Sequence, residues 1–441
     1  MNRPVVAVAV LLLASSFLSA QQPDPRLSAY IESIPAIDNH AHVIAPANPG
    51  DRDYDALPCD ALPASPGPGF ANLRFSPDDV AAWQALWGFP ATGDSPQQLR
   101  EVEARRAAAR RKLGLGYDDW VLRRANVATV LANRVAMAPG LSAPHFLWVP
   151  YDDALLFPLD NSLAANRNPD RHVFFRLEEA ILKDYVRESG QQKLPATLDG
   201  YLDSVVTPTL ERQKKSGAVA IKFEVAYLRA LDFRPTSKSA ADDVYQRYIG
   251  GATPGLADYK TLQDFLFGYI AAEAGRLGMA VHIHTGIGCG DYFDVRGSDP
   301  MLLEPVLNDP ALRHTNFVLL HGGTPFNREV AGLIVKPNVY VDTSLLELLF
   351  SPAEMARVLR PWLEIMPEKV LYGSDAGPLG PSVDWEEGTW IGSRHARQVL
   401  AIALSGMVRE HAISASRARS IARGILHDNA AALYHLPEAK Q

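Results

Sequence analysis

Several side chains suited to metal ligation stand at the ends of short apolar runs, although they lie far apart in the chain. His40 and His42 form an HxH pair in the stretch DNHAH. Because side chains on a strand alternate between faces, both imidazoles would point the same way and could share one cation. The same position is filled by His284 in HIHTG, His321 in LLHGG and Asp375 in YGSDAGP. Strand ends of this kind carry the active sites of parallel barrels.

We predict that the metal ligands are His40, His42, His284 and Asp375. A carboxylate at Asp375 could bind the cation with one oxygen and take a proton from water with the other, acting as ligand and general base. The alternative for Asp375 is a helix N-cap, and for the HxH pair a hydrogen-bonded core pair. His321 is either a further ligand or a catalytic imidazole that holds the attacking water or the polarised oxygen.

Lys222 lies in AVAIKF with the parity of two small residues, which would place it inside the narrow barrel. An unpaired ammonium is costly there. Three interpretations stay open: a carbamylated lysine that bridges two cations, a cation that binds a substrate carboxylate or phosphate, and a salt-bridged lysine without a chemical role. Arg229 could extend this anion-binding patch or lie on the surface. His282 has the parity of His284 but lies one layer deeper, where a hydrogen-bonded interior residue is expected.

Eight apolar runs could position these residues. The first ends at His42, and the others span 127–133, 146–150, 218–223, 279–284, 316–321, 339–342 and 369–375. Helical patterns separate most of them, so we predict an α/β fold, a (β/α)8 TIM barrel with loop and helical insertions. Residues 45–120 would hold a Pro-rich loop and helices at 78–87 and 97–113, 232–260 a second insertion, and 394–433 outer helices. We expect residues 21–441 to form a single domain.

The first 20 residues have the order of a secretory signal peptide: Arg3, a short apolar core and a small-residue exit ending at Ala20. We therefore expect export to the periplasm or the medium. Cys59 and Cys289 are the only cysteines, and we favour two reduced thiols over a disulfide between them, because two loops would have to bring them together.

Composition excludes some functions. The formal net charge of −7 and the absence of a Lys/Arg run argue against a nucleic-acid partner. The apolar core of the leader is too short for stable membrane insertion. The expected partner is a small-molecule substrate, and the oligomeric state stays open.

The ordered motifs DNHAH, IKFEVAYLR, HIHTGIG, LLHGG, YVDTS, YGSDAGP and ILHDNAAALYHL resemble those of the amidohydrolase superfamily. More narrowly, they are similar to the family-two amidohydrolases and to the amidohydrolase-like domain that is fused to glutamine synthetase in some plants and fungi. The resemblance implies that His40, His42, His284 and Asp375 hold one zinc or similar divalent ion, with His321 assisting. It leaves open a second ion beside Lys222.

The expected function is a metal-dependent hydrolase that uses activated water on a C–N bond (an amide, including the γ-glutamyl type) or on an ester or lactone. Lys222 or Arg229 would bind a carboxylate of the small substrate. One alternative keeps the site and changes the reaction to metal-dependent decarboxylation of an unsaturated or aromatic acid. Another is a non-catalytic exported binding protein.

Overall fold

The structure, a computed structural model, describes residues 22–44, 76–138, 140–378 and 382–436. Within these ranges the chain forms eight strands, all paired in parallel. Their bounds are β1 Ala36–Ala41, β2 Val127–Asn133, β3 Phe146–Val149, β4 Ala220–Phe223, β5 Ala280–His284, β6 Phe317–Leu320, β7 Val339–Asp342 and β8 Val370–Leu371. Neighbouring strands follow the chain order, first β1 to β3 and then β4 to β8.

Two sets of backbone contacts join these sheets into a ring. Isolated parallel bridges from Trp148 to Ala218 and from Tyr151 to Lys222 connect β3 to β4. On the other side the segment after β8 pairs with β1, since Asn39 N–H donates to the Tyr372 carbonyl at 2.8 Å. The predicted (β/α)8 barrel is confirmed. The last strand is shorter than expected, because the chain after Leu371 turns to follow β1.

The interior of the ring is filled by one apolar cluster to which the strands contribute mostly small or branched side chains, which fit its narrow width. Partly buried Tyr340 packs against it from β7, and α18 (Asn429–Leu433) covers it from below. The buried members are Ile37, Leu131, Val149, Ala220, Ala280, Val318, Leu320, Leu371, Ala430, Leu433 and Tyr434. The floor of the barrel is therefore largely apolar.

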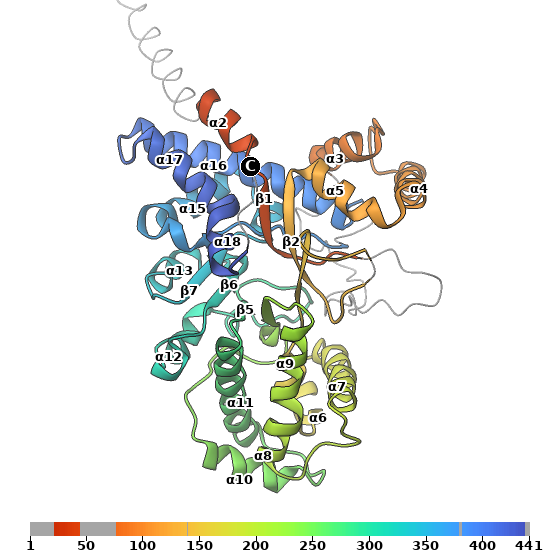
Figure 1. Cartoon of the computed structure of the whole chain (residues 1–441), viewed down its shortest axis with the longest axis vertical. Helices are drawn as coiled ribbons and strands as arrows, with labels where there is room; N and C mark the ends of the chain where they lie inside the picture. Colours follow the sequence, from red (N-terminus) through yellow and green to blue (C-terminus); the bar gives the residue numbers. More distant parts are fainter. Residues whose placement is uncertain (1–21, 45–75, 139, 379–381, 437–441) are drawn as a thin grey trace, which may run out of the picture.

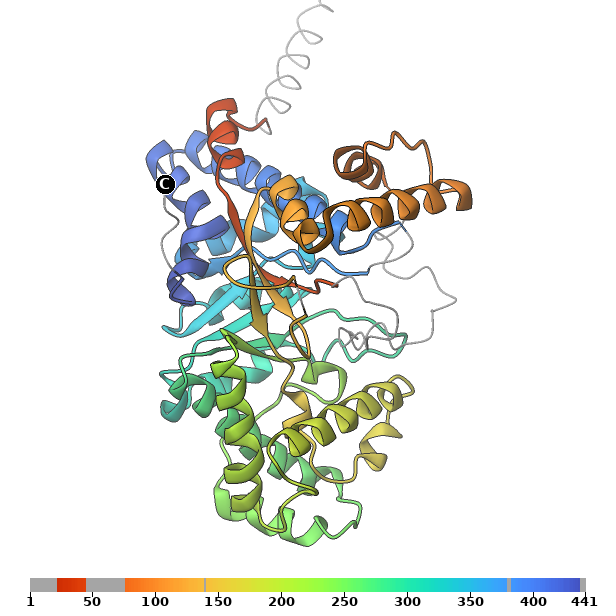
Figure 2. The same ribbon diagram turned by 45° about the vertical axis from the view of Figure 1, so that its right-hand side comes forward.

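Helices surround the ring and extend from it at both ends (Figures 1 and 2). The helices that come before β4 are α2 Pro25–Glu32, α3 Pro77–Trp87, α4 Pro96–Leu113, α5 Tyr117–Ala125, α6 Ser162–Ala165, α7 Arg171–Glu188, α8 Leu198–Tyr201 and α9 Thr207–Lys215. The later ones are α10 Lys238–Tyr248, α11 Leu256–Arg276, α12 Glu304–Leu307, α13 Asn327–Leu333, α14 Leu346–Leu349, α15 Pro352–Ile365, α16 Trp385–Arg409 and α17 Ala415–Arg423. None of the described helices has the length and apolar content needed to cross a bilayer.

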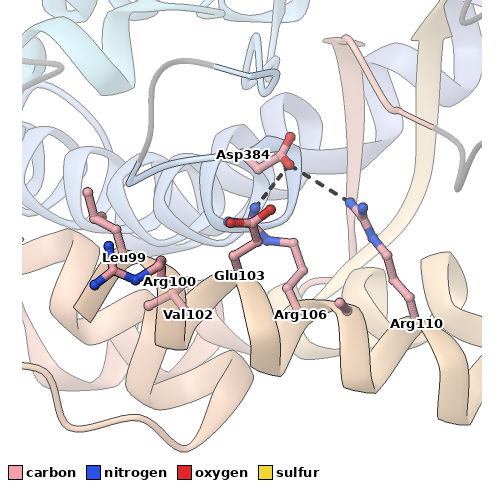
Figure 3. Close-up of a pocket in the computed structure, with 8 residues that line it drawn as sticks. Leu99, Arg100, Val102, Glu103, Arg106, Arg110 and Asp384 are labelled. Carbon is pink, nitrogen blue, oxygen red and sulfur yellow. Dashed lines mark hydrogen bonds and ion pairs between the residues drawn. The ribbon is translucent and has the colours of Figure 1, made fainter. Parts of the chain in front are cut away.

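The predicted helices at 78–87 and 97–113 are present as α3 and α4, whereas the Pro-rich stretch 45–75 lies outside the described residues. Helix α4 contacts the start of α16 through partly buried ion pairs. Arg106 lies 2.9 Å from Glu387 and 3.1 Å from Asp384, and Figure 3 shows the pair with Asp384. This insertion is therefore held against α16 by charged side chains.

Helix α7 was not predicted, although its buried positions have helical spacing. Phe174, Glu178, Leu182 and Tyr185 recur every three or four residues along its inner face. The predicted insertion at 232–260 contains α10 and the first turn of α11.

Candidate metal centre

The seam between β1 and β8 brings together residues from the two ends of the chain. The Asp375 N–H donates to the His40 carbonyl at 2.8 Å, and the His42 N–H donates to the Ala376 carbonyl at 2.7 Å. Asp375 takes a positive φ of 56°, in the left-handed region that side-chain-bearing residues rarely adopt. Strain of this kind persists where surrounding bonds hold it and is concentrated at functional sites.

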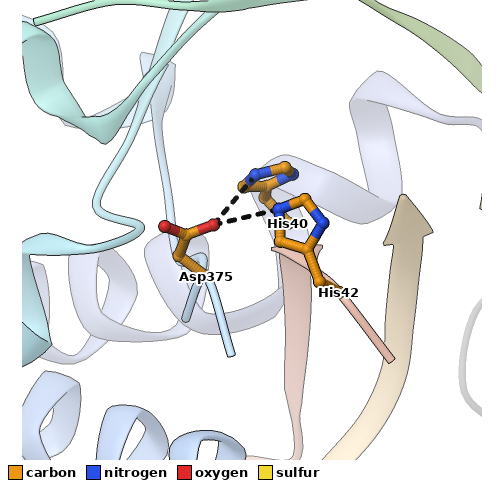
Figure 4. Close-up of side chains that lie close together, drawn as sticks. All are labelled: His40, His42 and Asp375. Carbon is orange, nitrogen blue, oxygen red and sulfur yellow. Dashed lines mark ion pairs between the residues drawn. The ribbon is translucent and has the colours of Figure 1, made fainter. Parts of the chain in front are cut away.

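His40, His42 and Asp375 form the one group of three candidate ligands that the described residues bring together (Figure 4). The Asp375 Oδ1 lies 3.1 Å from His40 Nε2 and 3.3 Å from His42 Nε2. Metal–ligand bonds of about 2.0–2.2 Å at tetrahedral angles place ligand atoms about 3.3 Å apart. The spacing of these three atoms therefore fits one small divalent cation.

The protonation states of the site also suit a cation. Burial, reinforced by the Lys222 ammonium, lowers the pKa of His40 well below its usual value, so the ring is neutral, which is the form that binds metals. Burial alone would raise the pKa of Asp375, but the surrounding histidines outweigh it and hold that pKa well below its usual range. The site thus offers the neutral imidazole of His40 and the ionised carboxylate of Asp375, with the His42 ring beside them.

Two residues outside this group, Tyr151 and Asp38, keep His42 and His40 in place. The Tyr151 hydroxyl lies 3.0 Å from His42 Nδ1 and turns the other ring nitrogen toward Asp375. Asp38, fully buried, accepts from the backbone N–H of Ser374 at 2.8 Å and from the His40 N–H at 3.2 Å. Sequence reasoning assigned a role to neither, although Asp38 lies on β1 two residues before His40 and Tyr151 lies two residues after the end of β3.

His321 and His284 lie beside the group rather than within it. His321 Nδ1 is 3.9 Å from Asp375 Oδ2, and the rings of His321 and His284 have centroids 4.5 Å apart. His284 Nε2 lies 3.2 Å from the Ile287 carbonyl, which can only accept, so its proton is on Nε2 and the lone pair is on Nδ1. Burial lowers the pKa of His321 to about 4. The ligand role of His284 and the catalytic role of His321 stay predictions.

Lys222 is buried inside the barrel, as its parity predicted. Its ammonium lies 3.4 Å from His40 Nε2 and 3.3 Å from Glu224 Oε1. Glu224 belongs to a buried acidic group that also includes Asp153 and Glu178, and burial raises the pKa of both. A carbamate on Lys222 would add negative charge to this acidic surrounding, so the contacts favour a cationic lysine.

Arg229 lies on the outer side of this region. Its guanidinium donates to Asp264 at 2.9 Å, to Gln263 at 3.0 Å and to Asp232 at 3.1 Å, and it lies over the Phe233 ring. These contacts occupy most of its donors and would compete with a substrate. Its substrate-binding role stays a prediction.

The favoured interpretation of the cysteines was wrong, because Cys289 is disulfide-bonded. Cys59, the only other cysteine of the chain, lies outside the described residues. Oxidation was disfavoured because loop positions cannot be judged from sequence spacing.

Part of the chain is similar to a known protein family. Residues 248–436 match the family described as Amidohydrolase. Protein fluG of Emericella nidulans is 29% identical over 232 residues, which cover 50% of this chain and 26% of that protein. The chain thus matches about a quarter of the length of this relative. Residues 248–436 of the chain are therefore similar to the amidohydrolase family.

Solved structures share the fold at low identity. A protein from Lactobacillus casei described as a metal-dependent hydrolase has a TM-score of 0.59 and 17% identity, with 93% of this chain and 97% of that chain covered. The uronate isomerase of Thermotoga maritima has a TM-score of 0.60 and 13% identity, with 94% and 98% covered. Both a hydrolase and an isomerase are therefore similar in fold, and the fold alone does not define the reaction.

Proposed function

We propose that this protein is a metal-dependent hydrolase that cleaves a C–N bond, or an ester or lactone bond, in a small carboxylate-bearing substrate. The observation that carries the proposal is the convergence of His40 Nε2 and His42 Nε2 on one oxygen of Asp375, at 3.1 and 3.3 Å. A divalent cation such as zinc, held by these residues, would supply Lewis acidity and lower the pKa of a water molecule.

The side chains around that point support the proton transfers of hydrolysis. Asp375 has a second oxygen, Oδ2, on the side of His321. This oxygen can take a proton from the attacking water and return it to the leaving amine or alkoxide. His321 lies where it can hold the water or the polarised carbonyl oxygen. Neutral imidazoles and an ionised carboxylate are the states that these roles require.

Lys222 supports a substrate with a carboxylate group. Its ammonium is buried between His40 and Glu224, with the two contacts at 3.4 and 3.3 Å. A cation in such a dry place attracts an anion strongly. A substrate whose carboxylate binds near Lys222 would have its adjacent amide or lactone carbonyl within reach of His40, His42 and Asp375.

The first test is metal content combined with turnover. We expect metal analysis to find a divalent cation in wild-type protein purified without chelator, and His40→Ala to lose both the cation and activity. His145→Ala, which removes an exposed histidine, serves as the matched control and should keep both. A His40→Ala protein with full metal content and full turnover would refute the proposal.

A second assay separates the reaction classes. A panel of small amides, lactones and unsaturated or aromatic acids is scored for released amine or acid against released CO2. Release of amine or ring-opened acid supports hydrolysis, whereas CO2 would assign the same residues to decarboxylation. Bound cation without turnover of any class would support a binding protein.

We also propose that the protein works outside the cytoplasm. The disulfide of Cys289 supports this, since such bonds persist in oxidising compartments. Fractionation of the native cell, with the protein found only in the cytoplasm, would overturn it.

A further inference from the structure

A polar group from the last described helix segment reaches through the apolar floor of the barrel. Tyr434, just after α18, is buried in the interior cluster of the strands. Its hydroxyl lies 2.7 Å from His282 Nε2 and 2.5 Å from Asn39 Oδ1. A tyrosine hydroxyl at this depth needs partners, and both partners are themselves buried side chains.

The direction of these hydrogen bonds is set at Asn39. Its amide nitrogen Nδ2 donates to Asp342 Oδ2 at 2.9 Å, so Oδ1 must be the atom that faces Tyr434. An amide oxygen only accepts, and the Tyr434 hydroxyl therefore donates to it. His282 Nε2 is then the donor to the Tyr434 oxygen, which leaves His282 Nδ1 as the unprotonated nitrogen. That atom has no hydrogen-bond partner among the described residues, as this tautomer allows.

The chain continues on the other side of Asp342 toward the candidate metal centre. Asp342 Oδ1 accepts from the backbone N–H of His321 at 2.9 Å and from the Ser344 hydroxyl at 2.7 Å. Ser344 Oγ also lies 2.9 Å from His321 Nδ1. Since the single hydroxyl proton goes to the Asp342 carboxylate, Ser344 must accept from His321, so the His321 proton is on Nδ1.

We propose that Tyr434 and His282 are positioning residues: through Asn39, Asp342 and Ser344 they hold the His321 proton on Nδ1 and leave Nε2 with the free lone pair. This inference deepens the proposed function and rests on it for the catalytic importance of His321. In that tautomer, neutral His321 accepts a hydrogen bond through Nε2. It therefore orients the attacking water, or serves as a further ligand, and does not donate to the carbonyl oxygen of the substrate.

Each bond of this chain constrains the next one. Without the Tyr434 hydroxyl, Asn39 Oδ1 loses its donor, and the amide can turn its oxygen toward Asp342. That orientation requires Asp342 to take a proton from solvent on Oδ2. Asp342 Oδ1 is then a weaker acceptor, so the Ser344 hydroxyl can donate to His321 Nδ1 while the His321 proton moves to Nε2. Tyr434→Phe should therefore convert a single His321 tautomer into a mixture. The effect would be transmitted through Asn39, Asp342 and Ser344, which lie between residue 434 and the His321 ring.

The experiment records long-range proton–nitrogen NMR spectra of the protein as purified, labelled with 15N at histidine. The spectra distinguish protonated from unprotonated ring nitrogens, and His321→Gln assigns the His321 signals. We expect wild type to show His321 protonated on Nδ1 alone and His282 on Nε2 alone. Ser344→Ala and Tyr434→Phe should each give mixed His321 tautomers, and the double variant should resemble Ser344→Ala alone.

The matched control is Tyr201→Phe, which also removes the hydroxyl of a buried tyrosine, here one that donates to the Leu155 carbonyl at 2.9 Å. It should lower the unfolding temperature as Tyr434→Phe does and leave His321 unchanged. A wild-type His321 that carries its proton on Nε2 would overturn the inference without any variant, even if Tyr434→Phe does not fold. So would an unaltered His321 pattern in folded Tyr434→Phe. Because the spectra do not depend on turnover, a protein with the expected tautomers but no cation would refute only the proposed function.

Discussion

Replacing Asp152 by asparagine should stabilise the protein at pH 8. Asp152 follows β3 and is fully buried; Oδ1 accepts from Gln213 at 2.8 Å, whereas Oδ2 has no partner among the described residues. Burial raises the pKa of Asp152 from 3.8 to about 7. Between these two values the folded protein keeps a proton that the unfolded chain has lost. The contribution of this group to stability is therefore full below about pH 4 and is lost as the pH rises to about 7.

The magnitude follows from the size of this shift. Three pKa units correspond to a cost on the order of 4 kcal/mol at pH 8 for holding Asp152 ionised in the fold. Asparagine carries no charge and keeps the bond from Gln213, but its amide N–H2 would occupy the place of Oδ2 and lack an acceptor. An unsatisfied donor costs about 1–3 kcal/mol. The net gain at pH 8 is therefore about 1–3 kcal/mol, and it should vanish or reverse at pH 4.

The assay is urea unfolding of wild type and Asp152→Asn at pH 8 and at pH 4. Asp94→Asn, which neutralises an exposed carboxylate, serves as the control and should change the free energy of unfolding little at either pH. If Asp152→Asn lowers stability equally at both values, Asp152 is not a buried charge at pH 8 and the reasoning fails.

Two further predictions concern the site and the disulfide. Tyr151→Phe removes the hydroxyl 3.0 Å from His42 Nδ1 and should weaken cation binding about 10-fold in a competition titration, since bonds of this kind orient the ligand; unchanged affinity would mean that Tyr151 does not orient His42. Cys289→Ser removes the disulfide and should lower the free energy of unfolding by about 2–4 kcal/mol in urea. Reductant should lower the stability of wild type by the same amount and leave the variant unchanged. Equal stability of oxidised wild type, reduced wild type and Cys289→Ser would contradict this prediction.

Local sequence patterns were sufficient for the strands and for the parity of the residues on them. An apolar run followed by a polar residue and a Gly-rich turn located β5 and β6, and β2 and β7 have the predicted bounds 127–133 and 339–342. Alternation placed His40 and His42 on the same side and Lys222 inside the barrel. These features depend on neighbours in the chain, which is why the sequence alone could reveal them.

The partners of these residues depend on contacts between distant segments, and no local pattern contains them. Arg229 is held by Asp264 of α11, a pairing that the motif around Arg229 does not encode. Ser344 beside His321 and Tyr434 beside Asn39 were unpredictable for the same reason. Helix α7 was missed although its spacing was legible, because the polar residues between its apolar ones obscured the period.

The junction of β1 and β8 gives the candidate ion a part in assembly. His40 and His42 leave the ribosome early, whereas Asp375 emerges only after more than three hundred further residues, so a growing chain cannot complete the set. An ion bound by all three would link β1 to the segment after β8, and it could bind fully only once the barrel has closed. Removal of the ion should weaken the pairing of these two segments first. Amide hydrogen exchange should then rise first at Asn39, His42 and Asp375, whose N–H groups form the hydrogen bonds between β1 and the segment after β8.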